Sequence, residues 1–241
     1  MKHILEIYDA TKKFGGLTAN EGITFDVAEG EILGIVGPNG AGKTTLFNSL
    51  SKEHRLTRGT IRFNGVDVTK KSTHEICKMG IGRTFQIPQS IKDLTVIENV
   101  LVGALCHTNS TIEARRIAEE MLEKCGIMWL AEMQVANLNV AQSKRLEIAR
   151  ALATRPKLLL LDETMSGLTT TERAESLNLI REINSEGITV LTIEHNMDVI
   201  MNVSERVLVL ISGKTLTIGT PAEVTSNEEV IDAYLGRPKH A

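Results

Sequence analysis

The sequence lacks several features that mark other classes of protein. Its three cysteines are widely spaced and follow neither a zinc nor a redox pattern, which predicts free thiols in a reducing compartment. No apolar run approaches the ~18 residues that span a bilayer, and no signal peptide is visible at the N-terminus. The net charge of −3 argues against general binding of nucleic acid or anionic lipid, although a local basic patch is compatible with it. Without repeats, low-complexity tracts or flexible linkers, the chain is expected to be compact and cytosolic.

The most informative stretch is a glycine-rich loop that matches the phosphate-binding pattern G-x-x-x-x-G-K-[ST]. A buried strand is predicted at 31–36 before it and a helix at 43–50 after it, which makes a chance match the weaker alternative. The glycines let backbone N–H groups approach a pyrophosphate, and the helix N-terminus adds partial positive charge. We therefore expect ATP here, with Lys43 at its β and γ phosphates and Thr44 at a Mg²⁺ ion. The predicted ATP-binding residues of the loop are Gly37, Pro38, Asn39, Gly40, Ala41, Gly42, Lys43, Thr44 and Thr45.

Strand patterns lie on both sides of a helical stretch. Apolar alternation predicts strands at 4–8 and 23–27, and Asn64-Gly65 predicts a hairpin between 59–63 and 66–68. The stretch 87–154 is expected to be mostly helical, with a capping box at Ser110 and Glu113 and a second helix from about Ser143 that stops before Pro156.

The C-terminal part returns to strands. A continuous apolar run at 158–161 predicts a central parallel strand, and Thr169 with Glu172 predicts a capped helix that ends at Gly187. Further strands are expected at 188–193 and in a closing hairpin of 207–211 and 215–218, before a short helical piece that ends near 234–236. The fold class is therefore α/β: a P-loop NTPase core with a mainly parallel sheet, an N-terminal antiparallel β subdomain and a helical insert. A single domain is expected, with its core at 1–86 and 155–241 and the helical subdomain at 87–154.

Several polar residues near predicted strand ends could act on the nucleotide. Asp162 could hold Mg²⁺ through water, and Glu163, one residue on, could polarise the attacking water. His195 could contact the γ-phosphate, and the Gln86 side-chain carbonyl suits Mg²⁺ or the water. Phe14 could stack on the adenine. The alternatives are a solvated strand end for the acidic pair, a surface histidine, a glutamine without a role, and core packing for Phe14.

These residues, in this order, resemble those of ABC transporter ATPases over nearly the whole chain. Finer features are similar to the ATPases of high-affinity branched-chain amino-acid importers. The segments that carry this resemblance are Phe14-Gly15-Gly16-Leu17-Thr18-Ala19, Gly82-Arg83-Thr84-Phe85-Gln86, Leu94-Thr95-Val96-Ile97-Glu98-Asn99-Val100, Arg145-Leu146-Glu147-Ile148-Ala149-Arg150-Ala151-Leu152, Ile193-Glu194-His195-Asn196-Met197, Gly219-Thr220-Pro221 and Ala233-Tyr234-Leu235-Gly236.

The resemblance implies an ATP-hydrolysing motor subunit that works as a peripheral protein on the cytoplasmic face of a membrane. It implies ATP and Mg²⁺ as cofactors. The implied partners are a second ABC ATPase subunit, identical or homologous, transmembrane permease subunits and, indirectly, an extracytoplasmic binding protein, with no nucleic acid. ATPases of urea, amide, aromatic-acid and lipopolysaccharide systems share much of the pattern. Two further alternatives are an ABC ATPase that acts on DNA or ribosomes and a regulatory subunit that binds ATP without useful turnover.

One family motif is altered in this chain. The resemblance implies that each ATP meets a Leu-Ser-x-Gly-Gln signature from the partner subunit. Here the signature residues are Leu138, Asn139, Val140, Ala141 and Gln142. Asn139 replaces serine and Ala141 replaces glycine, and a Cβ at Ala141 would penalise a positive φ or a close phosphate approach.

The loop after Glu163 also departs from the family pattern, with Thr164 in place of proline and Thr169 in place of aspartate or asparagine. We therefore expect asymmetry: the site on this chain's own Lys43, Asp162, Glu163 and His195 stays competent, whereas the partner's site is slow. The alternative is that both sites turn over.

Overall fold

The computed structural model describes residues 2–86, 90–194 and 197–235, and these form two compact units. One unit comprises residues 74–188, and the other comprises the described residues before 74 and after 188. The domain boundaries expected at 86/87 and 154/155 stay a prediction. The predicted α/β class, with antiparallel and mainly parallel sheet segments and helices, is confirmed.

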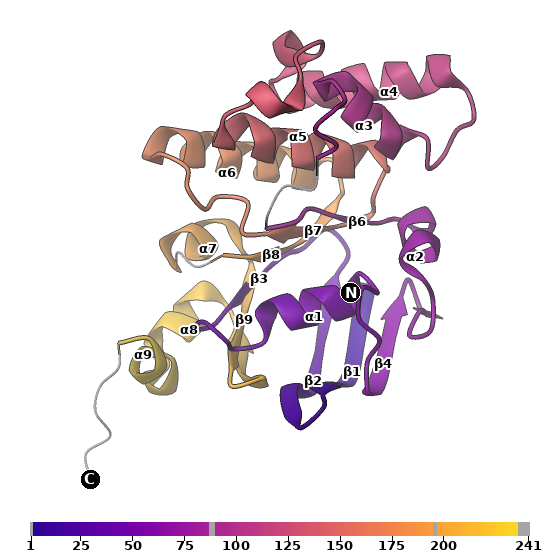
Figure 1. Cartoon of the computed structure of the whole chain (residues 1–241). Helices are drawn as coiled ribbons and strands as arrows, with labels where there is room; N and C mark the ends of the chain where they lie inside the picture. Colours follow the sequence, from indigo (N-terminus) through magenta and orange to yellow (C-terminus); the bar gives the residue numbers. More distant parts are fainter. Residues whose placement is uncertain (1, 87–89, 195–196, 236–241) are drawn as a thin grey trace. The chain divides into compact units, whose positions relative to one another are not determined.

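The unit formed by the described residues before 74 and after 188 begins with an antiparallel sheet in the order β2-β1-β4-β5. Figure 1 shows β2, β1 and β4 side by side. Its strands are β1 (His3–Phe14), β2 (Leu17–Ala28), β4 (Arg58–Phe63) and β5 (Val66–Asp67). β1 and β2 are longer than the sequence pattern predicted, because they continue to a tight turn where Phe14 pairs with Leu17. The predicted hairpin at Asn64-Gly65 is confirmed, since both residues have the positive φ angles, 49° and 75°, that such a turn uses.

The same unit holds four strands in the order β10-β9-β3-β8. β3 (Ile32–Val36) runs parallel to β8 (Thr189–Ile193) and β9 (Arg206–Ile211), and β10 (Lys214–Gly219) closes an antiparallel hairpin on β9. Every residue of β3 and β8 is buried, as continuous apolar strands covered on both faces should be. The helices of this unit are α1 (Lys43–Leu50), α7 (Met197–Val203), α8 (Pro221–Ser226) and α9 (Glu228–Leu235).

The other unit combines a short parallel strand pair with packed helices. β6 (Ile81–Arg83) runs parallel to β7 (Leu158–Asp162), with Arg83 opposite Leu160. The helices are α2 (Thr73–Met79), α3 (Val96–Ala104), α4 (Thr111–Lys124), α5 (Val140–Ala153) and α6 (Thr170–Ser185), with short 3-10 turns η1 (Met128–Leu130) and η2 (Val135–Asn137). Helices α3, α4 and α5 pack against one another (Figure 1). The predicted helical character of this part of the chain is thus confirmed.

Two details of the helix prediction were wrong. α5 begins at Val140 rather than near Ser143, because Asn139 and Gln142 cap its first turn. At α4 only half of the predicted capping box forms: the Ser110 hydroxyl accepts from the Glu113 N–H, but the Glu113 carboxylate accepts instead from the Thr108 hydroxyl at 2.8 Å. The box at Thr169 and Glu172 forms in full and starts α6.

Candidate functional site

The phosphate-binding loop connects a fully buried strand to a helix, as the sequence predicted. Gly37, directly after β3, is still buried, whereas Pro38, Asn39 and Gly40 are exposed. α1 starts at Lys43, and its first turn contains no acidic residue, which leaves the positive end of the helix dipole uncompensated by a carboxylate there. A loop of this kind is suited to bind an anion.

Two glycines of the loop are required by close contacts. A Cβ atom at Gly37 would lie 2.3 Å from the carbonyl oxygen of Leu210, and one at Gly42 would lie 2.4 Å from Nδ2 of Asn20. Gly42 also has a φ of +93°, which L side chains rarely adopt. Asn20 makes use of this approach by donating a hydrogen bond to the Gly42 carbonyl at 3.1 Å. The glycines therefore allow the loop to lie against β9 and the start of β2.

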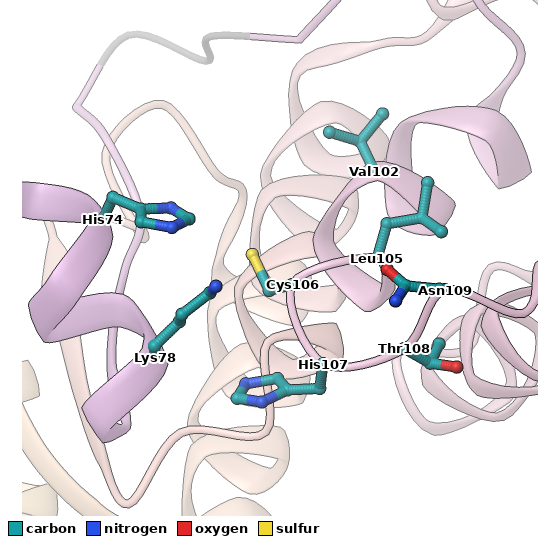
Figure 2. A pocket seen from close by; sticks show the side chains of 8 residues that line it. All are labelled: His74, Lys78, Val102, Leu105, Cys106, His107, Thr108 and Asn109. Atoms are coloured by element: carbon teal, nitrogen blue, oxygen red, sulfur yellow. The ribbon is translucent and has the colours of Figure 1, made fainter.

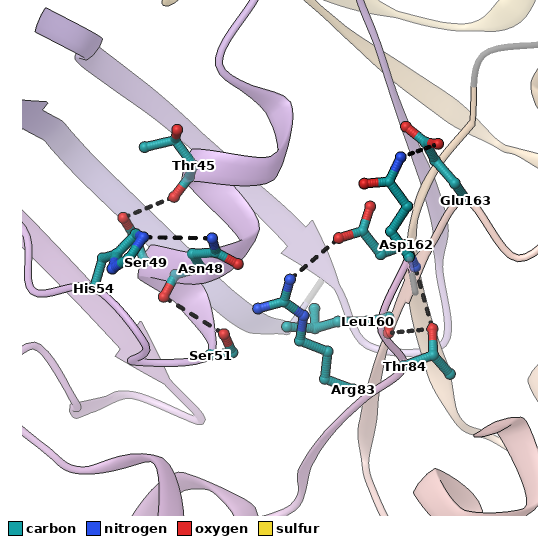
Figure 3. Close-up of polar contacts among 11 residues, drawn as sticks. Thr45, Asn48, Ser49, Ser51, His54, Arg83, Thr84, Leu160, Asp162 and Glu163 are labelled. Atoms are coloured by element: carbon teal, nitrogen blue, oxygen red, sulfur yellow. Dashed lines mark hydrogen bonds and ion pairs between the residues drawn. The ribbon is translucent and has the colours of Figure 1, made fainter. Parts of the chain in front are cut away.

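Lys43 is folded onto the loop that precedes it. Its side chain is buried, and Nζ donates to the carbonyl oxygens of Gly37 at 2.6 Å and Pro38 at 3.1 Å. Thr44 is exposed at the start of α1, whereas Thr45 is half-buried one residue deeper. In Figure 3 the carbonyl of Thr45 accepts from the Ser49 hydroxyl at 3.0 Å within α1. The structure thus places an ammonium group and an exposed hydroxyl at this loop.

Phe14 lies at the end of β1 with 42% of its surface exposed. The ring stands edge-on to His54, with centroids 5.3 Å apart and planes at 81°, and the Lys12 ammonium lies 4.7 Å from the Phe14 centroid. Core packing, the alternative considered from the sequence, is excluded by this exposure. Adenine stacking on Phe14 stays a prediction.

In the unit formed by residues 74–188, two buried carboxylates lie at the end of β7: Asp162 is its last residue, and Glu163 follows it. Asp162 pairs through Oδ2 with Nη2 of Arg83 at 3.1 Å (Figure 3). Glu163 accepts a hydrogen bond from Nε2 of Gln86 at 2.7 Å. Asp162 and Glu163 are 1% and 5% exposed, so each charge is largely removed from bulk water. Charges buried this far require polar or charged partners.

The backbone around this acidic pair is held by two further side chains. The buried Thr84 hydroxyl accepts from the N–H of Asp162 at 3.2 Å, and Nζ of Lys144 donates to the carbonyl of Glu163 at 2.6 Å. Glu163 has a φ of +50°, an unusual conformation for a residue with a side chain. Lys144 therefore supports a strained residue at a candidate catalytic position.

The altered signature forms the N-terminus of α5. Asn139 is the N-cap: its Oδ1 accepts from the N–H of Gln142 at 2.9 Å, and Oε1 of Gln142 accepts from the N–H of Asn139 at 3.0 Å. Ala141 lies in the first turn of this helix and has no positive φ. The conformational penalty that its Cβ could have caused therefore does not arise.

The signature also borders a pocket of about 320 Å³. Asn139 and Val140 are exposed at its rim. The side-chain nitrogen of Asn139 makes no hydrogen bond within the described part of the chain. The pocket is lined by Gln86, Leu138, Asn139, Val140, Ser143, Lys144 and Ser166. Gln86 thus contacts Glu163 and also faces the signature residues.

Sequence reasoning missed the direct partners of the acidic pair. Arg83, Thr84 and Lys144 were not predicted to act, although Arg83 and Thr84 stand in the Gly82–Gln86 segment that carried the family resemblance. The predicted site residue His195 lies outside the described residues. Among the residues that the structure describes, no helix is long and apolar enough to cross a membrane.

The sequence matches two protein-family models and several known proteins. The family model "ABC transporter" matches residues 20–166, and the model "Branched-chain amino acid ATP-binding cassette transporter" matches residues 214–240. The high-affinity branched-chain amino acid transport ATP-binding protein BraF of Pseudomonas aeruginosa is 38% identical, over 97% of this chain and 98% of its own length.

Solved structures agree with this assignment. An ATP-binding cassette of an ABC transporter in its ADP conformation is 31% identical, with a TM-score of 0.87 over 98% of this chain and all of the other. A dimeric ATP-binding cassette in a post-hydrolysis state, bound to ADP and Pi, is 27% identical, with a TM-score of 0.83 over 90% of this chain and 98% of the other. The chain belongs to the ATP-binding proteins of ABC transporters, a family that hydrolyses ATP to power transport.

Proposed function

We propose that this chain is the ATP-hydrolysing motor subunit of an importer for branched-chain or related amino acids, peripheral on the cytoplasmic face of the membrane. The observation that carries the proposal is the 38% identity to a branched-chain amino acid transport ATPase along 97% of the chain. The match of residues 214–240 to a branched-chain amino acid transporter model supports the same cargo class.

In the proposed reaction, the phosphate-binding loop holds the triphosphate of ATP. Lys43 exchanges its hydrogen bonds to Gly37 and Pro38 for the β and γ phosphates, and the α1 N-terminus stabilises their charge. Thr44 and Asp162 would hold Mg²⁺, with Gln86 as a further oxygen donor. A bound Mg²⁺ supplies charge neutralisation between the β and γ phosphates.

Glu163 is proposed to orient and polarise the water that attacks the γ-phosphate, with His195 as a second contact to that phosphate. The support for this role is that Glu163 is only 5% exposed and that its carboxylate accepts a hydrogen bond from Gln86 at 2.7 Å.

 The φ of +50° at Glu163, supported by Lys144, fixes the direction in which this carboxylate leaves the strand. A carboxylate held in this way is suited to act as a general base on a water molecule.

A second ATPase subunit is proposed as the direct partner, because the family resemblance places each nucleotide against a partner's signature. The dimeric cassette described above, bound to ADP and Pi, supports this arrangement. ATP would close the two subunits, and hydrolysis would let them part. Transmembrane permease subunits would receive this movement through the helical insert expected at residues 87–154.

Replacement of Glu163 by glutamine tests the ATPase part of the proposal. Glu163→Gln keeps the side chain's size but removes its basicity. ATP should therefore still bind, while steady-state turnover in the assembled complex falls by at least about 100-fold, the lower end of what a general base contributes. The variant should also trap an ATP-bound dimer that size-exclusion chromatography detects. Turnover at the wild-type rate would contradict the assignment of Glu163.

Uptake by cells tests the cargo. In the host that makes this chain, its removal should abolish high-affinity uptake of radiolabelled leucine, isoleucine and valine, and Lys43→Ala should fail to restore it. Unchanged uptake of these amino acids, together with loss of urea, amide or aromatic-acid uptake, would move the chain to another ABC importer.

A further inference from the structure

Two of the three cysteines lie next to each other, although they are far apart in the sequence. Sγ of Cys77, on α2, is 3.9 Å from Sγ of Cys106, which follows α3. Both side chains are half-buried. A disulfide has an S–S distance of about 2.05 Å, so the two sulfurs need to approach by only about 2 Å to form one. The third cysteine, Cys125, is 1% exposed and has no such neighbour among the residues described.

A pocket of about 400 Å³ opens onto one of these two thiols. Cys106 lines the pocket, and Cys77 does not. Figure 2 shows Cys106 between the α2 side chains His74 and Lys78 and the side chains of Val102 and Leu105. A small molecule that enters the pocket therefore contacts Cys106 and not Cys77.

The polar side chains of the pocket favour an anionic ligand. Lys78 contributes a positive charge, and the imidazoles of His74 and His107 contribute hydrogen-bonding groups. The carbonyl oxygen of Thr154 can only accept, so His107 donates to it from Nε2 at 2.7 Å, which fixes the orientation of this ring. Among the described residues that line the pocket, none is acidic. A small disulfide that carries carboxylates, as glutathione disulfide does, matches this lining.

We propose that Cys106 and Cys77 form a thiol–disulfide exchange site for an anionic low-molecular-weight disulfide. The thiolate of Cys106 attacks one sulfur of the small disulfide, the disulfide bond breaks, and one small thiolate leaves and is protonated. Cys77 then loses its proton and attacks Sγ of Cys106, which releases the second small thiol. The balance is two protein thiols and one small disulfide converted to one protein disulfide and two small thiols.

The order of the two steps follows from access and acidity. Burial, with Cys106 beside it, raises the pKa of the Cys77 thiol to about 11, so Cys77 is a poor first nucleophile at neutral pH. In the second step Cys77 attacks a sulfur that is already within contact distance, and proximity offsets its low thiolate population. Burial also raises the pKa of Cys125 to about 12, which makes Cys125 an internal reference that should stay reduced.

The product would cross-link α2 to the segment between α3 and α4. Because all of these elements belong to residues 74–188 except the first residue of α2, the bond would tighten one compact unit. The inference does not depend on the proposed cargo or on ATP turnover, and its test does not use them.

The experiment treats the full-length purified chain with millimolar oxidised glutathione at neutral pH, quenches it with acid, blocks free thiols and maps peptides by mass spectrometry without reduction. We expect a peptide pair linked through Cys77 and Cys106, with Cys125 blocked as a free thiol. Cys77→Ser should accumulate a glutathione adduct on Cys106, whereas Cys106→Ser should leave Cys77 unmodified. Thermal melting of both variants checks that they are folded.

Two results would overturn the proposal. One is a wild-type chain in which Cys77 and Cys106 stay reduced, or carry separate glutathione adducts, under conditions that oxidise an exposed model thiol. The other is a rate of adduct formation at Cys77 in Cys106→Ser that equals the rate at Cys106 in Cys77→Ser.

A final comparison uses cystamine, a cationic disulfide: it should react at least several-fold more slowly than glutathione disulfide, and Lys78→Ala should reduce that difference. An equal rate for the two disulfides would contradict the anionic preference.

Discussion

The side-chain amide of Gln86 donates a 2.7 Å hydrogen bond to the carboxylate of Glu163, so the segment after β6 contacts the candidate catalytic residue after β7. Gln86 also lines the pocket beside Asn139 and Val140. One side chain therefore links the proposed general base with the residues proposed to meet the partner's nucleotide. A change in the position of this segment would alter the orientation of Glu163.

We expect Gln86→Ala to lower ATP turnover more than it weakens ATP binding. A hydrogen bond to a charged group contributes about 1.5–3 kcal/mol, which corresponds to roughly 10- to 150-fold in rate if the bond orients Glu163 in the transition state. The measurements are kcat in the assembled complex and the dissociation constant for ATP. Ser90→Ala is the matched control, because Ser90 lies in the same segment but donates to Glu147 at 3.2 Å. Equal losses of kcat in both variants would contradict a specific role of Gln86 in orienting Glu163.

The buried pair of Arg83 and Asp162 should stabilise the fold but weaken the binding of Mg²⁺ to Asp162. Arg83→Met removes the cation beside a carboxylate that is 1% exposed, and loss of one partner of a buried pair costs about 3–5 kcal/mol. We expect the free energy of unfolding of the nucleotide-free variant, measured with urea, to be lower than that of the wild type by this amount. Added Mg²⁺ should raise the Tm of Arg83→Met more than that of the wild type, since the ion would no longer compete with the guanidinium for Asp162.

Arg83→Lys provides the control for that measurement, because it keeps the charge but loses the planar geometry of the guanidinium. It should recover part of the lost stability and reduce the effect of Mg²⁺. If Mg²⁺ shifts the Tm of all three proteins equally, Arg83 does not compete with the ion at Asp162.

Local patterns made part of this arrangement predictable from the sequence. The phosphate-binding loop and the strand ending at Asp162 were found because their apolar runs and glycine spacing are properties of one short segment. The contacts of Arg83 were not found, because they depend on the pairing of β6 with β7, and β6 has only three residues. No periodicity can be recognised in so short a strand.

The start of α5 shows a signal that was present and was not used. Asn139 and Gln142 have the spacing of a capping box, and asparagine is among the best N-cap residues. Because Asn139 was interpreted only as a replaced signature serine, the helix was predicted to begin at Ser143. The same residue is both a signature residue and a helix cap, and the second role depends only on local sequence.

Three exposed glutamates should make the chain less stable in acid. At the starts of α3, α6 and α8, the backbone N–H of a threonine and then its hydroxyl hold the pKa of Glu98, Glu172 and Glu223 below the ordinary value of 4.5. A carboxylate whose folded-state pKa is lowered contributes stability that is complete above pH 4.5 and is lost as the pH falls through the lowered pKa. Acid should therefore weaken these three helix starts.

The triple variant Glu98→Gln, Glu172→Gln and Glu223→Gln tests this dependence. Glutamine can keep the capping hydrogen bonds but does not titrate. The free energy of unfolding, measured with urea from pH 6 to pH 3, should therefore fall less steeply with decreasing pH in the variant than in the wild type. Glu113→Gln is the control, since Glu113 does not complete a capping box. Parallel pH profiles for wild type and triple variant would contradict the prediction.

The altered signature gives the last prediction, which concerns the partner's nucleotide. Asn139→Ser with Ala141→Gly should restore a fast second site, raising turnover of the assembled complex towards the rate of two competent sites. If the missing interaction is one hydrogen bond to a charged phosphate, the turnover rate of the slow site should rise roughly 10- to 150-fold.

Asn139→Ser alone should give most of the gain, because serine is also a good N-cap and Ala141 already has a helical backbone with no positive φ. Asn139→Ala, which can neither cap α5 nor donate, should instead lower stability by about 1 kcal/mol and leave the second site slow. Unchanged turnover in the double variant would show that Asn139 and Ala141 do not limit the partner's site, and the two sites would then be equivalent in this respect.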